Sequence, residues 1–238
     1  MRRVTRFGVR RFLCGVAALG ALAVAGTASA IVGGVVDQTH TYVGAYLQQQ
    51  VQGGQAGTEL CTGFLIGPRS FVTAAHCYDP AGEPVLVSFD TGLGRAASFT
   101  TATFAGAQDD VAVFTLADAQ SDWAALPAVN ASASAGSVDV VGYGVLGLTP
   151  QKTPTGVGVR EVATAPVKSA GNLRDVSLKL LSSPGACFGD SGGPNLLHGT
   201  DTVVAITSGG SKNCNGVSYA ERIDTPAMLA FLSQFADE

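Results

Sequence analysis

Short runs of β-branched and aromatic residues recur along the chain, and segments rich in Gly, Pro and Ser separate them. Runs of this kind predict strands. The six clearest lie at residues 64–66, 85–89, 98–104, 111–116, 138–143 and 203–207. Short strands spaced in this way favour a sandwich or a barrel over alternating strand and helix units. The chain is therefore expected to be all-β.

One segment near the C-terminus departs from this pattern. After Pro226, a residue suited to the first turn of a helix, hydrophobic residues recur at helical spacing: Met228, Leu229, Phe231, Leu232 and Phe235. We expect a helix there that packs on the body of the protein. Residues 127–136, rich in Ala and Ser, are the best linker candidate and divide the rest of the chain into two domains, 31–130 and 131–238.

The first 30 residues have the pattern of a signal peptide. An apolar stretch at 13–25 and the small residues Ala28-Ser29-Ala30 follow a basic head made of Arg2, Arg3, Arg6, Arg10 and Arg11. A transmembrane anchor is the alternative, but about 20 apolar residues are needed to span a bilayer and this run is shorter. We expect cleavage after Ala30 and a secreted, extracellular protein without membrane contact.

Charge excludes two classes of partner. Removal of the first 30 of the 238 residues leaves 208, with nine basic and 18 acidic residues and a formal charge of −9. This balance argues against nucleic acid or an anionic membrane as a partner. Charged residues make up only 13% of the chain and Gly is abundant at 31, which favours compact turns over disorder.

The cysteines agree with export. Cys14 leaves with the signal segment, and an even set remains for disulfides: Cys61, Cys77, Cys187 and Cys214. Three pairings are possible, of which the near-neighbour pairing closes the shortest loops, each contributing about 3 kcal/mol in the chain-entropy view. A zinc site is the competing interpretation, but the spacing contains no Cys-x-x-Cys or Cys/His cluster.

Three stretches carry candidate chemistry: VTAAHC (72–77), DDVAVFTL (109–116) and ACFGDSGGP (186–194). Together with Ile31-Val32-Gly33-Gly34 they resemble the trypsin/chymotrypsin family of serine endopeptidases, with His, Asp and Ser in that family's order. The resemblance covers residues 31–238. It implies two antiparallel six-stranded β-barrels with an active site between them, and a secreted bacterial enzyme acting on proteins or peptides.

The resemblance assigns the catalytic roles. An alcohol is a poor nucleophile at neutral pH, so Ser191 needs a base within hydrogen-bond reach and a carboxylate that orients this base. His76 is the expected base and Asp110 the expected carboxylate. Asp109 is the alternative, but Asp110 directly precedes an apolar run, as the family's acid does.

The serine motif also fits the G-x-S-x-G elbow of α/β-hydrolases. That fold needs a helix after the serine and then an acid and a histidine, whereas Gly192, Gly193 and Pro194 oppose a helix. By resemblance to the trypsin family, the N–H groups of Gly189 and Ser191 form the oxyanion hole.

By the same resemblance, Asp190 pairs with the α-ammonium group that chain cleavage creates at Ile31. A buried carboxylate left without its partner costs about 3 to 5 kcal/mol. The Ala-Ser-Ala site abuts Ile31 with no residue between them. We therefore expect removal of the signal segment to create the active N-terminus in the same step.

Specificity is expected to be for apolar residues. Gly185 stands at the base of the family's substrate pocket, where trypsins have Asp, so a substrate Lys or Arg would bury an uncompensated charge. The pocket wall includes Ser208 and Gly210 but lacks the family's aromatic residue. No cofactor or metal is expected, and the protein is expected to be monomeric. A binding homologue with little turnover and a secreted esterase with the same triad remain as alternatives.

Overall fold

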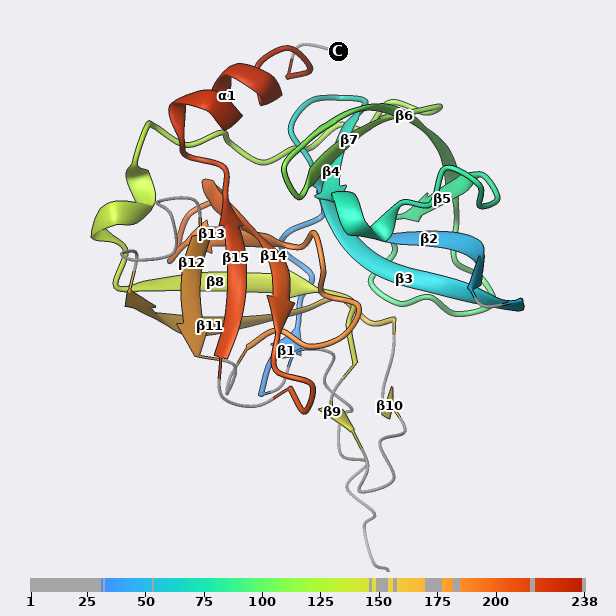
Figure 1. Ribbon diagram of the computed structural model, residues 1–238, viewed down its shortest axis with the longest axis horizontal. Coiled ribbons are helices and arrows are strands. Elements are labelled where there is room, and N and C mark those ends of the chain that lie inside the picture. The colour runs from blue at the N-terminus through green and yellow to red at the C-terminus, as the bar shows by residue number, and fades with distance from the viewer. Residues whose placement is uncertain are drawn as a thin grey trace, which may run out of the picture.

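The computed structural model describes residues 31, 33–52, 54–145, 147–148, 154–155, 158–169, 177–181, 185–214 and 217–236. The expected signal segment lies outside them. Two antiparallel β-barrels lie side by side (Figure 1). The first closes in the order β2-β3-β4-β7-β6-β5. Its strands are β2 (Val43–Gln52), β3 (Gln55–Leu65), β4 (Ser70–Ala74), β5 (Val85–Ser88), β6 (Thr100–Gln108) and β7 (Val111–Leu116).

The second barrel is a sheet in the order β11-β12-β15-β14-β13-β8, closed by the pairing of β11 with β8. Its strands are β8 (Ser137–Gly142), β11 (Glu161–Ser169), β12 (Ser177–Leu181), β13 (Pro194–Leu197), β14 (Val203–Gly210) and β15 (Val217–Arg222). The short β1 (Val35–Val36) pairs with β11 and attaches the beginning of the described chain to this barrel. The expected all-β fold of two six-stranded barrels is confirmed.

The connections between these strands are short or irregular. β9 (Gly147–Leu148) and β10 (Pro154–Thr155) form a separate two-stranded ribbon. The chain passes from one barrel to the other through residues 117–136, which include the 3-10 turn η2 (Ala131–Ser134). The predicted linker falls in this stretch, and the domain boundary at residue 130 stays a prediction.

Different side chains fill the two barrels. Large aromatic residues are fully buried in the first barrel, among them Tyr46, Phe64, Phe71 and Phe114. The second barrel has a separate cluster of smaller residues, including Val138, Val140, Ala165, Leu180 and Val204. Every residue of β4 is buried, and so are all but one of β7. These two strands therefore give a firm base to the residues that follow β4 and precede β7.

Some strands were not expected because their sequences are polar or interrupted. β2 contains a Gln-rich stretch, yet Gln48 and Gln50 are buried. Gln48 Nε2 donates to the carbonyl oxygens of Asp79 (2.8 Å) and Glu83 (3.0 Å), and Gln50 Nε2 donates to that of Cys77 (2.9 Å). These bonds link β2 to distant loops, so local hydropathy did not predict them.

The expected C-terminal helix is confirmed as α1 (Pro226–Leu232), with Pro226 in its first turn. The Thr225 side chain caps it by accepting a hydrogen bond from the N–H of Met228 at 3.3 Å. Met228 and Leu232 are buried in the core cluster that contains the first barrel. The helix ends earlier than its hydrophobic pattern indicated, and Phe235 lies in the turn that follows it. The carbonyl oxygen of Phe235 accepts a 2.6 Å hydrogen bond from Ser70 Oγ.

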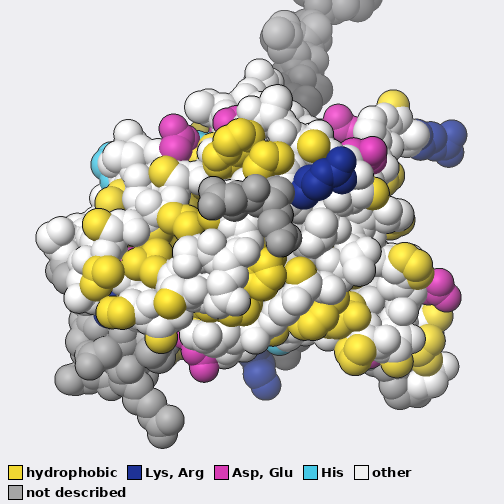
Figure 2. Space-filling view, turned by 90° about the horizontal axis from the view of Figure 1, so that it is seen from above, with side chains coloured by type: hydrophobic (Ala, Val, Ile, Leu, Met, Phe, Trp, Pro, Cys, Tyr) yellow, Lys and Arg dark blue, Asp and Glu magenta, His cyan; other side chains and the backbone are white. Residues whose placement is uncertain are grey.

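The end of the molecule that carries α1 presents few charged side chains, with hydrophobic ones scattered among polar atoms (Figure 2). This agrees with the low content of charged residues, 13% of the chain. No helix in the described part of the chain is long and apolar enough to cross a membrane.

Candidate active site

Two neighbouring strands of the first barrel bring His76 and Asp110 together. His76 lies in the 3-10 turn η1 (Ala75–Cys77) that follows β4, and Asp110 directly precedes β7. The strands pair with Ala74 opposite Val111. His76 Nδ1 therefore lies 3.0 Å from each carboxylate oxygen of Asp110, and the main-chain N–H of His76 donates to Asp110 Oδ1 at 3.1 Å.

A third group holds this pair from the second barrel. The hydroxyl of Ser208, on β14, donates to Asp110 Oδ2. Burial alone would raise the pKa of Asp110, but hydrogen bonds from His76 and Ser208 outweigh it and hold this pKa below its ordinary value. The hydrogen bond to Asp110 raises the pKa of His76 against the opposing effect of burial. An ionised Asp110 keeps the proton on Nδ1 and leaves Nε2 of His76 able to accept one.

Asp109 has a different place. It sits in the turn between β6 and β7 with a left-handed backbone, φ 50°. The structure thus brings Asp110, and not its neighbour, to the ring of His76.

Ser191 lies in the loop before β13, and both barrels fix its backbone. The N–H of Thr62, on β3, donates to the carbonyl of Ser191 at 2.9 Å, and the N–H of Gly192 donates to that of Thr207, on β14, at 2.7 Å. Ser191 and His76 line the same cleft. The cleft is therefore lined by the predicted nucleophile and by the imidazole that Asp110 contacts.

Gly189 needs to be glycine at this place. Its φ is 93°, and a Cβ atom there would lie 2.8 Å from Gly144 Cα. Its carbonyl accepts a 2.8 Å hydrogen bond from Thr62 Oγ1, and the same hydroxyl accepts one from the N–H of Tyr143 at 3.0 Å. Thr62 thus fixes the segment that holds Gly189. The oxyanion role of the Gly189 and Ser191 N–H groups stays a prediction.

Asp190 is fully buried beside the predicted nucleophile. Its carboxylate accepts hydrogen bonds from the N–H of Gly144 at 2.8 Å and of Cys187 at 2.7 Å. Burial raises the pKa of Asp190 to about 7, with a further contribution from the charge of Glu161, although the two backbone bonds act in the opposite direction. A Cβ atom at Gly142 or Gly144 would lie 2.1 or 2.6 Å from the Asp190 carboxyl group, so both positions need glycine.

Ile31 is also fully buried, in the core cluster of the second barrel. It is an internal residue here, and its peptide N–H donates to Glu161 Oε2 at 3.1 Å. Glu161 is itself 0% exposed. The predicted Ile31–Asp190 pair requires a free amino group at Ile31 and stays a prediction.

The cleft between the barrels has a volume of about 560 Å³. Its hydrophobic lining residues are Leu60, Val145, Ala186 and Phe188. Ser208 and Gly210 line it as well, whereas Gly185 is buried and its neighbour Ala186 reaches the surface of the cleft. Glu59 is the one acidic residue among the described residues that line it.

Two disulfides hold the segments around this cleft. Cys61 is bonded to Cys77, the residue after His76, and Cys187 is bonded to Cys214. Both follow the near-neighbour pairing.

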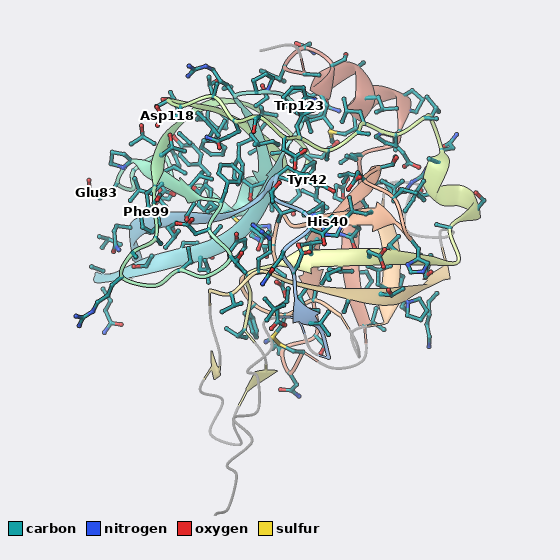
Figure 3. The ribbon with its side chains drawn as sticks, turned by 180° about the vertical axis from the view of Figure 1, so that it is seen from behind. His40, Tyr42, Glu83, Phe99, Asp118 and Trp123 are labelled. Carbon is teal, nitrogen blue, oxygen red and sulfur yellow. A yellow bond between two sulfur atoms is a disulfide. The ribbon has the colours of Figure 1, made fainter. Side chains whose placement is uncertain are left out.

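The other two histidines each contact an aspartate away from the cleft. His40 Nδ1 lies 3.1 Å from Asp37 Oδ1, and His40 and Tyr42 lie between the two barrels (Figure 3). His198 is mostly exposed and contacts Asp139 at 2.8 Å. Among the residues that the structure describes, no group of three or more His, Cys, Asp or Glu side chains is placed to hold a metal ion.

Comparison with known proteins agrees with this arrangement. A family model described as Trypsin matches residues 31–229. The chain belongs to the trypsin family. Membership in this family supports a serine protease, and a search of curated protein sequences gave no match.

Solved structures share the fold. One described as HL collagenase has a TM-score of 0.69 at 18% identity, covering 87% of this chain and all of that chain. One described as GrC has a TM-score of 0.66 at 19% identity, covering 86% of this chain and 98% of that chain. A third, described as HBP, has a TM-score of 0.65 at 18% identity, covering 86% and 95%.

Three contacts of this trypsin-family chain were not foreseen from the sequence. Ser208 was expected on the pocket wall and also bonds Asp110. Thr62 ties the barrels together, and Glu161 contacts the nitrogen of Ile31. Only the Glu161 contact could have been suspected from the sequence, because Arg160 and Glu161 are two charged residues between Val159 and Val162.

Proposed function

We propose that this chain is a secreted serine endopeptidase that hydrolyses peptide bonds through an acyl-enzyme on Ser191. The observation that carries the proposal is the His76–Asp110 pair, 3.0 Å apart, beside a cleft that both His76 and Ser191 line. Family membership supports the same reaction.

In the proposed reaction His76 acts first as a base and then as an acid. His76 Nε2 takes the proton of Ser191 Oγ as this oxygen bonds to the substrate carbonyl carbon, and Asp110 stabilises the resulting imidazolium. The N–H groups of Gly189 and Ser191 bind the oxyanion. The intermediate collapses, the C–N bond breaks, and His76 passes its proton to the leaving amine. Water then repeats the sequence on the acyl-enzyme, releasing the acid and restoring Ser191.

Substrate preference follows from the lining of the cleft. Val145, Ala186 and Phe188 supply apolar surface there, and Ser208 and Gly210 are uncharged. An apolar side chain would bury surface at about 25 cal/mol per Å², whereas a Lys or Arg would lose hydration without a carboxylate partner at the predicted pocket base, Gly185. We therefore infer cleavage after apolar residues.

Export and activation are proposed to be one event. Cleavage of the Ala30–Ile31 bond by signal peptidase would free the nitrogen of Ile31, a residue whose side chain lies in the core of the second barrel and whose nitrogen lies 3.1 Å from the buried carboxylate of Glu161. The protein would then act outside the cell on protein or peptide substrates. N-terminal sequencing of the secreted protein tests this step: a start at any residue other than Ile31 would refute it.

A panel of matched peptide amides and simple esters tests the reaction itself. The expected result is hydrolysis of amides with an apolar residue before the scissile bond, absent from Ser191→Ala. Hydrolysis of esters alone would indicate an esterase. No turnover of any member by a folded, correctly processed chain would indicate a binding homologue.

A further inference from the structure

Glu59 brings a negative charge to the cleft, next to the predicted general base. It lies on β3, with Oε1 3.9 Å from Cys61 Sγ, and Cys61 is bonded to Cys77, the residue that follows His76. The charge of Glu59 contributes to the raised pKa of His76. In the described part of the chain, no Lys or Arg side chain forms an ion pair with Glu59. Its half-buried carboxylate is therefore open to a cation from another molecule.

A second hollow, of about 380 Å³, begins at Glu59. It is lined by Gln50 and by residues 55–59, so Glu59 borders both this hollow and the cleft that holds Ser191. Figure 1 shows β2 and β3 running out past the other strands of the first barrel as a two-stranded ribbon. The hollowed surface thus continues from the cleft along β3, away from Ser191.

The first half of β3 has an open edge on the side away from β2. β4 pairs only with residues 63–65, and no other described strand pairs with this edge. The N–H of Thr62 points away from β2, because it donates to the carbonyl of Ser191. Backbone groups alternate in direction along a strand, and the β2–β3 ladder has no register shift, so the N–H and C=O groups of Leu60 and Thr58 also point to the open edge. An extended peptide can pair with such an edge.

The geometry sets which substrate residues face Glu59. In the proposed reaction the leaving nitrogen takes its proton from His76, so the leaving part of the substrate starts beside His76 and runs along β3 in the opposite direction to that strand. In an extended chain, the first and third residues after the scissile bond project to one face and the second to the other. Glu59 shares its face of β3 with Cys61, whose disulfide adjoins His76. The first and third residues therefore lie on the Glu59 face.

Building on the proposed function, we propose that Glu59 is a specificity-determining residue that selects Lys or Arg as the first or third residue after the scissile bond, in a polypeptide extended along the open edge of β3. The substrate cation makes a charge-assisted hydrogen bond with the carboxylate. Like charges disfavour a wrong partner, here a substrate with Asp or Glu at these positions. This preference is separate from the apolar preference before the scissile bond, which rests on residues such as Ala186 and Phe188.

Matched peptides test the proposal with the mature chain, 31–238. Each has the same apolar residue before the scissile bond and carries Lys, Gln or Glu as the first, second or third residue after it. At the first or third position, kcat/KM should be about three- to tenfold higher for Lys than for Gln, and lower again for Glu. Glu59→Gln should remove this preference and Glu59→Lys should reverse it. Glu83→Gln is the matched control and should keep it, since Glu83 lies exposed at the outer edge of the first barrel (Figure 3). A ratio of two substrates on one enzyme at one pH cancels any effect of Glu59 on the pKa of His76.

Binding separates this proposal from the proposed reaction. Labelled peptides of the same set bind to the Ser191→Ala chain, and fluorescence anisotropy gives their Kd without turnover. Kd should be about three- to tenfold lower for Lys than for Gln only when Glu59 is present, and the difference should shrink as salt is added. Equal values for Lys and Gln, a preference that survives Glu59→Gln, or a preference confined to the second position would overturn the proposal. A chain that binds with the expected preference but cleaves no peptide would refute the proposed function and leave the role of Glu59 supported.

Discussion

Thr62 connects the two halves of the candidate site, and replacing it by Val tests that connection. Its hydroxyl donates to the carbonyl of Gly189 at 2.8 Å and accepts from the N–H of Tyr143 at 3.0 Å. Thr62 and Tyr143 are both 0% exposed. Val has nearly the same shape but leaves both partners unsatisfied. Each buried unsatisfied group costs about 1 to 3 kcal/mol, so two such groups would cost about 2 to 6 kcal/mol. Because Gly189 is only partly buried, we expect Thr62→Val to lower the free energy of unfolding by about 2 to 4 kcal/mol.

The same change should affect catalysis, because the freed carbonyl belongs to Gly189, whose N–H is a proposed oxyanion donor. We expect kcat to fall by about 10- to 100-fold, less than the roughly 10²- to 10³-fold effect of deleting a donor, since the N–H is displaced and not removed. Thr62→Ser is the matched control: it keeps the hydroxyl and loses one buried methyl group, worth about 1 kcal/mol. Urea unfolding and steady-state kinetics measure both effects. Equal stability and kcat for the Val and Ser variants would refute the reasoning.

Three further predictions use the pKa directions and the close contacts of the site. Because Asp110 raises the pKa of His76, kcat/KM should increase with pH with a midpoint above the ordinary 6.5. Asp110→Asn should lower the plateau of kcat/KM by about 10³- to 10⁴-fold and move this midpoint to lower pH. An unchanged midpoint would argue against the coupling of the two residues. Before cleavage, the pKa of Asp190 is raised from 3.8 to about 7, so the folded chain binds more protons than the unfolded one and its stability should fall as pH rises across that interval. Asp190→Asn should flatten this decline in urea titrations at pH 5 and pH 8, and a persistent decline would contradict it. Gly144→Ala places a Cβ atom 2.6 Å from the Asp190 carboxyl and should lower the free energy of unfolding, measured by thermal denaturation, by at least about 2 kcal/mol. Gly57→Ala is the control and should have a much smaller effect, because no atom lies within 4 Å of a Cβ at that position. Equal melting temperatures for the two variants would be inconsistent with the packing.

The features predicted correctly from the sequence are those that depend on short stretches of the chain. The short β-branched and aromatic runs between Gly, Pro and Ser predicted the all-β class, and Pro226 with the helical spacing after it predicted the helix that the structure contains. The near-neighbour cysteine pairing is also present. The motif around His76 and the acid before β7 also pointed to residues that the structure places 3.0 Å apart.

What escaped prediction depends on contacts between distant segments. Gln48 and Gln50 have the polarity of surface residues, but they are buried because they donate hydrogen bonds to carbonyl groups in the distant segment Cys77–Glu83. Ser208 reaches Asp110 only because the barrels face each other, and Glu161 meets Ile31 only through the β1–β11 pairing. Strand register and barrel packing, and not residue type, create these sites.

Covalent labelling with a serine-directed phosphonate tests the central claim most directly. Intact-mass spectrometry of the mature chain should show one adduct per molecule, mapped to Ser191 by peptide analysis, slowed strongly by His76→Ala and absent from Ser191→Ala. A folded chain beginning at Ile31 that remains unlabelled, or that is labelled equally without Ser191, would contradict the account.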